Sequence, residues 1–523
     1  MAACGRAQPR LGARLNRSAA LRRLSDEQFD VLVIGGGATG LGAAVDAAAR
    51  GYRTALIETE DFAAATSSRS TKLIHGGVRY LQRGDIGLVR EALRERAALR
   101  RNAPHLVEDR TFVVPAYRRF EIAYYAAGLA AYDFLARGSG FPRSRIVSPG
   151  RARELIPALA PERLRGAIVY HDGQFDDARV AIALARTAAD RGAALANYVR
   201  ATGFVYDANR RIIGATAVDR ESSEELTVRA RVTINATGSF ADALRALDAP
   251  SARPLLAHSR GSHVVVSAEA LGHPRGALLV PRTSDGRVVF AIPWLGHVVI
   301  GTTDTAISEP EADPAASADE IAYLLATVNR YLAVPVTPRS VLATFAGLRA
   351  LVARKPATTA KLSREHLVSV SPSGLVTIAG GKWTTYRKMA EDAVDAAART
   401  AGLTPSPSST AGMPLHGAAY ASELLMLIAD DAALGERLDP RLPYTGAHVV
   451  YAVRAEMART VEDVLARRTR ALFLDVEAAR ASAPRVAALM ASEQRRDAAW
   501  AAAEIARFDS VAARRSVEPP SAS

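Results

Sequence analysis

Apolar residues follow two different periods along this chain, and the change from one to the other outlines its architecture. Near the N-terminus, Asp30-Val-Leu-Val-Ile34 is a continuous apolar run, typical of a strand that is buried on both faces. A glycine-rich turn follows, and then an alanine-rich segment of helical character that ends at Arg50, with Gly51 as its C-cap. A second apolar run spans Thr54 to Glu58. This order predicts a β-α-β unit of a parallel sheet.

Six further short runs predict strands, and the segment 178–191 between them has helical period. The runs between 263 and 302 are separated only by short turns, which favours an antiparallel arrangement. We therefore expect an α/β protein in which a parallel nucleotide-binding sheet is interleaved with a smaller antiparallel sheet. The six runs are 167–170, 232–235, 263–266, 288–293, 298–302 and 376–379.

The last part of the chain has helical period only. Residues 404–410 are rich in proline and serine and read as a linker. Beyond them, Val453, Met457, Val461 and Leu465 fall on one face of a helix, with arginines on the other. This pattern predicts an all-helical C-terminal domain.

Composition narrows the classes of function. A length of 523 residues suggests about three structural units, and no apolar stretch approaches the ~18 residues needed to span a bilayer. The single cysteine, Cys4, excludes a disulfide framework, and we expect no metal site. The formal charge of +13 points to an anionic partner, which leaves a phosphate substrate, a lipid surface and a nucleic acid open.

The N-terminal segment is basic. Residues 1–25 contain six arginines and no acidic residue, which superficially resembles an organellar transit peptide. Because the segment is poor in serine and arginine is abundant throughout, we interpret it as a disordered bacterial arm. We accordingly expect a cytoplasmic protein.

The turn after the first strand carries a nucleotide-binding motif. Gly35-Gly-Gly37-Ala-Thr39-Gly40 is a G-x-G-x-x-G sequence that follows a strand and opens a helix, the context in which the match is meaningful. The first glycine permits the tight turn, the second lets the backbone approach a pyrophosphate, and the third packs helix on strand. Glu58, which ends the second strand, is placed to accept a hydrogen bond from a ribose 2′-hydroxyl. The motif alone does not separate FAD from NAD.

Two polar loops favour the larger cofactor. Residues 66–80 arrive just after Glu58, and the turn 235–238 follows another buried strand. Buried phosphate and isoalloxazine atoms each need hydrogen-bond partners, and loops of this kind supply them. Each loop taken singly is also compatible with ordinary turn chemistry.

Lys382 stands out because the chain is poor in lysine. Only five of its 67 basic residues are lysines, so a lysine here suggests a position where a compact ammonium, rather than a planar guanidinium, is needed. Lys382 follows two glycines and precedes Trp383-Thr-Thr385, the setting of a backbone turn against a ligand. A chance surface lysine is the alternative.

From about Asp30 to about Leu474 the chain closely resembles the FAD-dependent, quinone-linked glycerol-3-phosphate dehydrogenase family. The resemblance is carried by the glycine turn with Asp46 and Arg50-Gly51, and by several further motifs. These are Ser70-Thr-Lys-Leu-Ile-His-Gly-Gly-Val-Arg-Tyr80, Phe175-Asp-Asp-Ala-Arg179, Gly301-Thr-Thr-Asp304, Ala346-Gly-Leu-Arg349, Gly380-Gly-Lys-Trp-Thr-Thr-Tyr-Arg387 and the helical segment 451–470.

The resemblance implies oxidation of sn-glycerol 3-phosphate to dihydroxyacetone phosphate, by hydride transfer to FAD, with electrons passed to a membrane quinone. It implies an FAD-binding Rossmann-like domain of the glutathione-reductase and D-amino-acid-oxidase type, with an interleaved antiparallel substrate domain and a helical C-terminal domain. Together with the glycine motif, it assigns cofactor binding to Gly35, Gly37, Thr39, Gly40, Glu58, Thr66, Ser67, Ser68, Lys72, His75, Gly76, Gly77, Ala236, Thr237, Gly238, Gly381 and Lys382.

Substrate roles follow from the chemistry. Arginine forks bind phosphate oxygens bidentately, and the resemblance points to Arg349 and Arg79. Tyr80 and Thr385 are candidates to bind the substrate, and Lys382 to stabilise negative charge on the reduced flavin or on the C2 oxygen. His263 and His75 are the alternatives for the base. Asp304 is expected to organise its loop rather than to react.

Other functions stay open. An oxidase of the same fold would pass electrons from glycerol 3-phosphate or an amine to oxygen. A basic nucleic-acid-binding protein is a further class, which we disfavour because aromatic residues make up only 6% and the basic residues form no cluster. The charged helix predicted over 88–101 is a candidate for peripheral attachment to an anionic membrane, on the inner face of the bacterial plasma membrane. A homodimer is also left open.

The expected domain boundaries follow these signals. We expect a disordered arm over 1–27, a linker over 401–417, a C-terminal helical domain over 418–512 and a disordered tail over 513–523. The FAD-binding domain is expected to comprise 28–80, 150–260 and 345–400, and the substrate (cap) domain 81–149 and 261–344.

Overall fold

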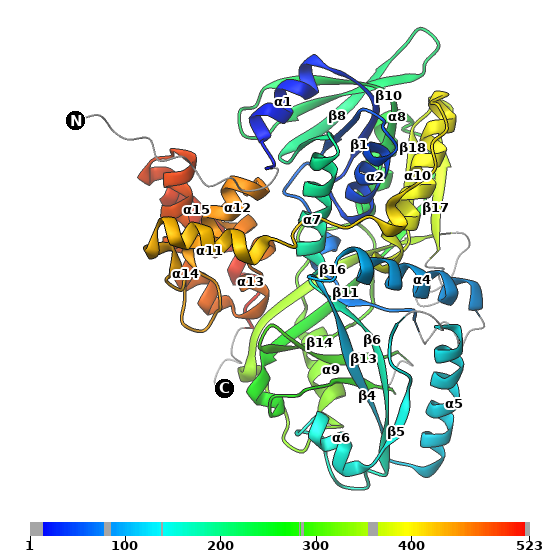
Figure 1. The fold of residues 1–523 in the computed structure, drawn as a ribbon, viewed down its shortest axis with the longest axis vertical. Helices are drawn as coiled ribbons and strands as arrows, with labels where there is room; N and C mark the ends of the chain where they lie inside the picture. Colours follow the sequence, from blue (N-terminus) through cyan, green and yellow to red (C-terminus); the bar gives the residue numbers. More distant parts are fainter. Residues whose placement is uncertain are drawn as a thin grey trace.

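The computed structural model describes residues 14–77, 85–136, 140–281, 283, 287–353 and 365–517. These residues form two sheets with their helices and a helical C-terminal domain that lies beside both sheets (Figure 1). No helix in the described part of the chain is long and apolar enough to cross a bilayer.

The first sheet is parallel at its centre. Its strands run in the order β17-β18-β10-β1-β2-β7, and β1 pairs in parallel with both β10 and β2. At the edges, β17 is antiparallel to β18, and β8 and β9 extend β10 as an antiparallel meander. The strands are β1 (Gln28–Ile34), β2 (Thr54–Ile57), β7 (Ala194–Ala196), β8 (Val199–Tyr206), β9 (Ile212–Asp219), β10 (Glu225–Asn235), β17 (His366–Val370) and β18 (Val376–Gly380).

Helices cover both faces of this sheet, which is why its central strands are continuous apolar runs. On one face lie α2 (Ala38–Ala49), α7 (Asp177–Asp190) and α10 (Tyr386–Ala401), and on the other α1 (Arg17–Asp26) and α8 (Ala241–Asp248). Small residues let α2 and α10 approach closely, since a Cβ added at Gly42 would lie 2.9 Å from the ring of Tyr386.

The second sheet is mostly antiparallel and is the larger one. Its order is β15-β11-β14-β13-β12-β4-β6-β3, with β16 paired to β11 and β5 to β6. The helices α6 (Pro149–Leu155) and α9 (Ala318–Asn329) cover one face, and α5 (Arg119–Leu135) packs near the other. The strands are β3 (Leu73–Ile74), β4 (Val107–Ala116), β5 (Arg145–Val147), β6 (Gly166–Phe175), β11 (Leu256–Ser267), β12 (Ala277–Val280), β13 (Val289–Trp294), β14 (His297–Gly301), β15 (Thr305–Ile307) and β16 (Val341–Val352).

The C-terminal domain consists of helices, as its sequence period predicts. Its core continues into the second sheet through Val265 and Phe345, so the domain is not an isolated appendage. The elements are α11 (Tyr420–Asp430), α12 (Gly446–Glu456), a π-helix (Asp463–Arg468), α13 (Ala471–Leu474), α14 (Val476–Gln494) and α15 (Ala498–Ala513).

All six predicted runs fall in strands to within one residue at their ends, although β6, β10 and β11 extend well beyond their runs, and several domain boundaries differ from expectation. The residues of β3, β6 and most of β16 were expected in the FAD-binding domain and belong to the second sheet. Pairing partners far away in sequence decide sheet membership, and a local apolar run does not reveal them.

The described residues of three segments that were expected to be disordered or a linker pack against the rest of the protein. Within the supposed disordered arm 1–27, α1 packs its Leu24 into a core, and Arg17 pairs with Asp219. The supposed linker 401–417 lies against the first domain with Met413 and Leu415 buried. In the supposed tail, Arg515 is buried against Asp313.

Candidate functional site

The glycine turn between β1 and α2 has room for backbone only. Gly35 adopts φ +115°, and a Cβ at this position would lie 2.6 Å from the carbonyl oxygen of Ala236. A Cβ at Gly40 would lie 1.9 Å from the carbonyl oxygen of Gly35. The turn therefore presents bare backbone at the N-terminus of α2, where an anionic group is stabilised.

Glu58 closes this turn from the side. Its carboxylate accepts hydrogen bonds from the backbone N–H of Gly36 at 2.5 Å and of Glu60 at 2.8 Å. Burial raises the pKa of Glu58, and the two N–H donors oppose that rise. The carboxylate thus ties the end of β2 to the glycine turn.

The loop after β2 joins three parts of the site. The hydroxyl of Ser67 accepts a hydrogen bond from the N–H of Ala38 at 2.9 Å, and the Ser67 carbonyl accepts one from Nε1 of Trp383 at 2.9 Å. Thr66 donates to the carbonyl oxygen of Leu348 at 2.8 Å. The start of α2, the turn before α10 and β16 are therefore held around one loop.

A cavity of about 760 Å³ lies between the two sheets and brings together half of the predicted site residues that the structure describes. It begins at the N-terminus of α2 and extends to the strands of the second sheet. The predicted residues that line it are Thr39, Thr66, Ser67, His75, Gly77, Gly238, His263, Arg349, Gly381 and Lys382.

Lys382 reaches the cavity from a tight turn. Gly380 and Gly381 both have positive φ, at +79° and +76°, and a Cβ at Gly381 would lie 2.3 Å from Sδ of Met389. Two glycines are thus required to turn the chain from β18 toward α10. The turn places Lys382 on the cavity wall.

Arg349 is held on the same wall by a small polar network. Its Nη2 donates to the hydroxyl of Thr302 at 3.0 Å, and its Nη1 lies 3.4 Å from Oδ1 of Asp304. Arg287 flanks the other side of Asp304, donating to its carbonyl oxygen at 2.7 Å. Two guanidinium groups around one carboxylate leave the wall with a net positive charge that suits an anionic ligand.

His263 and His75 both line the cavity, in different surroundings. His263 is buried, stacks on Phe345 with ring centroids 4.5 Å apart, and has its Nε2 3.0 Å from the hydroxyl of Thr71. Burial and the positive charges of Lys72 and Arg349 lower the pKa of His263 well below its usual value. Its imidazole is therefore neutral at pH 7. His75 is half-buried, and its backbone N–H donates to Thr384 at 3.3 Å.

Lys72, which was predicted to bind the cofactor, is not among the residues that line the cavity. Its ammonium donates to Asp177 and to the carbonyl oxygen of Ser68, both at 2.7 Å, beneath the loop. Burial lowers the pKa of Lys72 to about 7, against the raising effect of Asp177.

Thr385 is likewise turned inward and donates to the carbonyl oxygen of Lys382 at 3.2 Å, which makes it part of the turn rather than of the wall. Gly76 packs against α4 (Ile86–Asn102) and α5, with its N–H 2.8 Å from the hydroxyl of Tyr132. Ala236 and Thr237 lie behind Gly35. Arg79 and Tyr80 are outside the described residues.

Some of the residues that line the cavity were not predicted from the sequence. Arg287 lies in no recognised motif, and Thr384 lies in the motif Gly380–Arg387 but was assigned no role. The far end of the cavity is apolar, and its aromatic residues come from β4, β6, β13 and α5; they are Phe112, Tyr170, Phe290, Tyr124 and Tyr125. Nothing local in the sequence distinguishes these residues from ordinary core positions.

Comparisons with known proteins agree with this geometry. Residues 30–387 match the family model described as FAD dependent oxidoreductase, and residues 408–501 match the one described as C-terminal domain of alpha-glycerophosphate oxidase. The mitochondrial glycerol-3-phosphate dehydrogenase of Homo sapiens is 41% identical, over 91% of this chain and 72% of its own length. The mitochondrial glycerol-3-phosphate dehydrogenase of Arabidopsis thaliana is 39% identical, over 92% of this chain and 85% of its own length.

Solved structures give the same result. The glycerol-3-phosphate dehydrogenase from Bacillus halodurans, complexed with FAD, superimposes with a TM-score of 0.77 at 29% identity, over 97% of this chain and 98% of that one. L-alpha-glycerophosphate oxidase from Mycoplasma pneumoniae, at 18% identity and a TM-score of 0.56 over 74% of this chain and 98% of that one, shares the fold.

Proposed function

This chain belongs to the family of FAD-dependent glycerol-3-phosphate dehydrogenases, and from that premise we propose that it oxidises sn-glycerol 3-phosphate to dihydroxyacetone phosphate. The observation that carries the proposal is one continuous cavity, which joins the N-terminus of α2, at Ala38 and Thr39 directly after the glycine turn, to Lys382 and Arg349. A dinucleotide site and an anion site are thus adjacent, as oxidation of a phosphorylated alcohol requires.

The described residues fit FAD. The glycine turn and the N-terminus of α2 would hold the pyrophosphate, and Glu58 would lie beside the adenosine ribose. The loop with Thr66 and Ser67 and the turn with Gly381 would hold the flavin end. FAD supplies the two-electron acceptor, which amino-acid side chains lack.

Arg349 and Arg287 would bind the substrate phosphate. Both lie on the cavity wall, and Asp304 holds them in place. A phosphate dianion between them would compensate their charge through short, charge-assisted hydrogen bonds. Arg79 and Tyr80 remain further candidates on the strength of the family resemblance.

Lys382 and the histidines would handle the C2 hydroxyl. As this hydroxyl gives up its proton, the ammonium of Lys382 would stabilise the negative charge that develops on oxygen. His263 and His75 are the candidate acceptors of the proton, and we favour His263. Its neutral imidazole is free to accept a proton, and a phosphate dianion at Arg349 would offset the positive charge that now lowers its pKa.

A membrane quinone is the proposed electron acceptor. In support, the cavity continues past its polar end into the aromatic region at Phe112, Tyr170 and Phe290, which suits an apolar ring rather than a phosphorylated triol. The residues Tyr124, Tyr125 and Gly128 of α5 form the border of this region. An apolar acceptor would therefore approach along α5.

The outer face of α5 suits a lipid surface. Phe120, Tyr124 and Phe134 are each more than half exposed, and the exposed positions between them are Ala123, Ala127, Gly128, Ala130 and Ala131. Exposed arginines flank this apolar stripe at 118, 119, 143 and 145. Figure 1 shows α5 on the outer edge of the molecule. An apolar face with a basic rim is typical of interfacial helices on anionic membranes.

The helix α5 takes the place of the helix predicted at 88–101 as the proposed membrane-binding element. Within α4, Arg96 is buried in an ion pair with Asp172, and Arg100 pairs with Asp109. Much of its charge is therefore compensated within the protein, so α4 is a poor candidate for contact with lipid.

Sedimentation with anionic liposomes at low salt tests the membrane proposal. The wild-type protein should sediment, and Phe120→Ser/Phe134→Ser should bind about tenfold more weakly because two exposed aromatic anchors are lost. Leu425→Ser, which removes an exposed leucine on α11 at the other side of the molecule, is the matched control. A wild-type protein that stays in solution would refute the proposal.

A turnover assay separates the two acceptors. With sn-glycerol 3-phosphate and a soluble quinone analogue in air, we expect reduction of the quinone with little hydrogen peroxide. Glycerol, which lacks the phosphate, should give no turnover. Peroxide formed in proportion to the substrate consumed would instead identify an oxidase.

A further inference from the structure

The C-terminal domain meets the cofactor half of the molecule through three buried arginines, Arg467, Arg468 and Arg470. Each is at most 3% exposed. A guanidinium taken out of water is tolerated only where carboxylates and carbonyl oxygens replace the lost solvent. The partners of these arginines therefore reveal which parts of the molecule the C-terminal domain holds.

Arg467 and Arg468 converge on Asp61, which has no exposed surface. Nε of Arg467 donates to Oδ2 of Asp61 at 2.6 Å, and Arg468 donates to both carboxylate oxygens at 2.6 and 2.9 Å. Burial alone would raise the pKa of Asp61, but the charges of Arg468 and Arg467 outweigh it and hold the pKa below its usual value. The ion pairs are thus intact at neutral pH.

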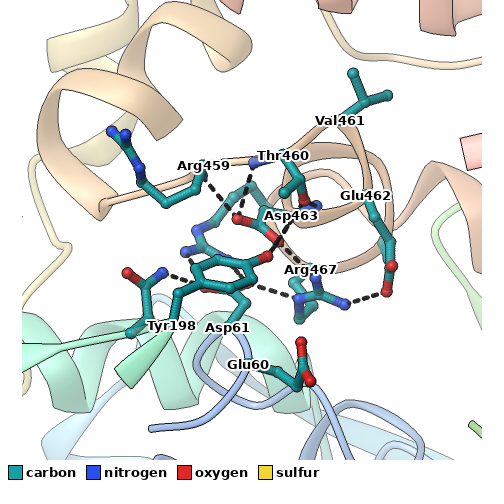
Figure 2. Close-up of polar contacts among 12 residues, drawn as sticks. Glu60, Asp61, Tyr198, Arg459, Thr460, Val461, Glu462, Asp463 and Arg467 are labelled. Carbon is teal, nitrogen blue, oxygen red and sulfur yellow. Dashed lines mark hydrogen bonds and ion pairs between the residues drawn. The ribbon is translucent and has the colours of Figure 1, made fainter. Parts of the chain in front are cut away.

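The π-helix Asp463–Arg468 fixes the direction of these side chains. Figure 2 shows Arg467 between Asp61, Asp463 and Glu462, with 2.7 Å contacts to the last two. Asp463 in turn accepts hydrogen bonds from the hydroxyls of Tyr198 and Thr460, both at 2.7 Å. π-Helical turns are uncommon and occur often at functional sites.

Arg470 reaches a second loop. Its Nη2 donates to the carbonyl oxygen of Ser68 at 2.7 Å and to Oδ1 of Asp177 at 3.0 Å. Lys72 donates to the same carbonyl oxygen and to the other oxygen of Asp177. Two cations therefore fix the backbone of Ser68 from behind.

The two loops that these arginines contact, at Asp61 and Ser68, contain the residues that hold the glycine turn between β1 and α2. Asp61 lies between Glu58, whose carboxylate binds the N–H of Gly36, and Ala63, whose N–H donates to the carbonyl oxygen of Gly36 at 2.9 Å. Ser68 follows Ser67, whose hydroxyl binds the first N–H of α2. A shift of either loop would displace the glycine turn or the cavity wall.

We propose that Arg467, Arg468 and Arg470 are positioning residues through which the C-terminal domain keeps FAD bound. None of the three lines the cavity, and they act by fixing the loops at Asp61 and Ser68. The proposal rests on the FAD assignment above, not on the identity of the substrate or the electron acceptor.

Release of FAD from the full-chain holoenzyme tests this role, because it needs no substrate. Flavin fluorescence after dilution gives the rate of release and, by titration, the dissociation constant. We expect Arg468→Met and Arg470→Met to raise the dissociation constant about 10- to 100-fold. Arg470→Lys, which keeps one donor for Ser68, should recover part of the loss. Asp61 keeps Arg467 in the Arg468→Met variant, so no uncompensated charge is buried.

Arg459→Met is the matched control. Arg459 binds Glu221 through two hydrogen bonds of 2.7 Å between the C-terminal domain and the turn from β9 to β10, but its side chain touches neither loop. It should lower the melting temperature like the other variants and leave the FAD dissociation constant within about twofold of wild type. If the Arg468 and Arg470 variants also stay within twofold, the arginines only hold the domains together and the proposal is wrong. A failure of substrate oxidation would leave this result unaffected.

Discussion

Lys72 and Lys382 stand in polar loops around one cavity, but their ammonium groups do different things. Lys72 is buried, and its pKa is lowered to about 7 by loss of solvent while it pairs with Asp177, 105 residues along the chain. Lys382 lies on the cavity wall at the end of a glycine turn. Both belong to family motifs, so the motif alone does not tell which lysine supports the loop and which faces the ligand.

Replacement of Lys382 by methionine should leave the fold and the FAD content unchanged and slow flavin reduction about 10²- to 10³-fold, because the positive charge at the developing oxyanion is lost. Stopped-flow absorbance measures the rate. Lys388→Met is the control, since Lys388 pairs with Glu391 and Asp392 on α10 and lies outside the cavity lining. Equal rates in Lys382→Met and wild type would show that Lys382 takes no part in the chemistry.

Arg349→Met should raise the KM for sn-glycerol 3-phosphate about 10- to 100-fold, because a charge-assisted contact to the phosphate is removed. Arg287→Met should have a smaller effect in the same direction, because Arg349 keeps its own contacts with Thr302 and Asp304. Steady-state kinetics measure both variants. An unchanged KM in both would place the phosphate elsewhere in the cavity.

The rate of flavin reduction in two variants distinguishes which histidine accepts the proton. His263→Asn should slow flavin reduction about 10²- to 10⁴-fold and remove the loss of rate at low pH, because the proton acceptor is absent. His75→Asn should retain the pH dependence. The opposite ranking of the two variants would assign the proton transfer to His75.

At the scale of elements, the runs buried on both faces were the most predictable part of this chain. Continuous apolar runs identified β1, β10 and β18, and the glycine motif identified the turn into α2. Charge patterns were less informative, since two of the α4 arginines that suggested a lipid contact, Arg96 and Arg100, pair with Asp172 and Asp109 on other elements. The apolar stripe of α5 is visible in the sequence, but its exposure depends on how the helix packs.

His448 at the start of α12 predicts a pH effect on stability. Burial, together with the charge of Arg179, lowers its pKa from 6.5 to about 4, and its Nδ1 accepts the N–H of Thr445 at 3.1 Å. Below pH 6.5 the unfolded chain binds a proton that the folded chain does not. The free energy of unfolding is therefore unaffected by His448 above pH 6.5 and decreases as the pH falls toward 4. The total decrease due to this group is at most about 3 kcal/mol.

The comparison of melting temperatures at pH 7 and pH 4.5 checks this effect. In His448→Gln, the fall in melting temperature between the two pH values should be smaller than in wild type, because the titrating group is gone. Equal falls would show that His448 titrates normally in the folded protein.

At the scale of the whole molecule, the chain passes repeatedly between the two sheets. The strands β3, β6 and β16 belong to the second sheet, although segments next to them in sequence belong to the first domain. Arginines of the C-terminal domain contact the loops at Asp61 and Ser68. The sequence predicted three units and some of the residues that line the cavity, among them Lys382 and Arg349. It could not predict these crossings or the role of Arg287, because both depend on contacts between residues far apart along the chain.

The most direct test of the central claim is anaerobic addition of sn-glycerol 3-phosphate to the purified protein, followed by the flavin absorbance. The account predicts that the oxidised flavin spectrum bleaches, and that it does not bleach with glycerol or with NADH. A flavin spectrum that is unchanged by sn-glycerol 3-phosphate would contradict the proposed reaction.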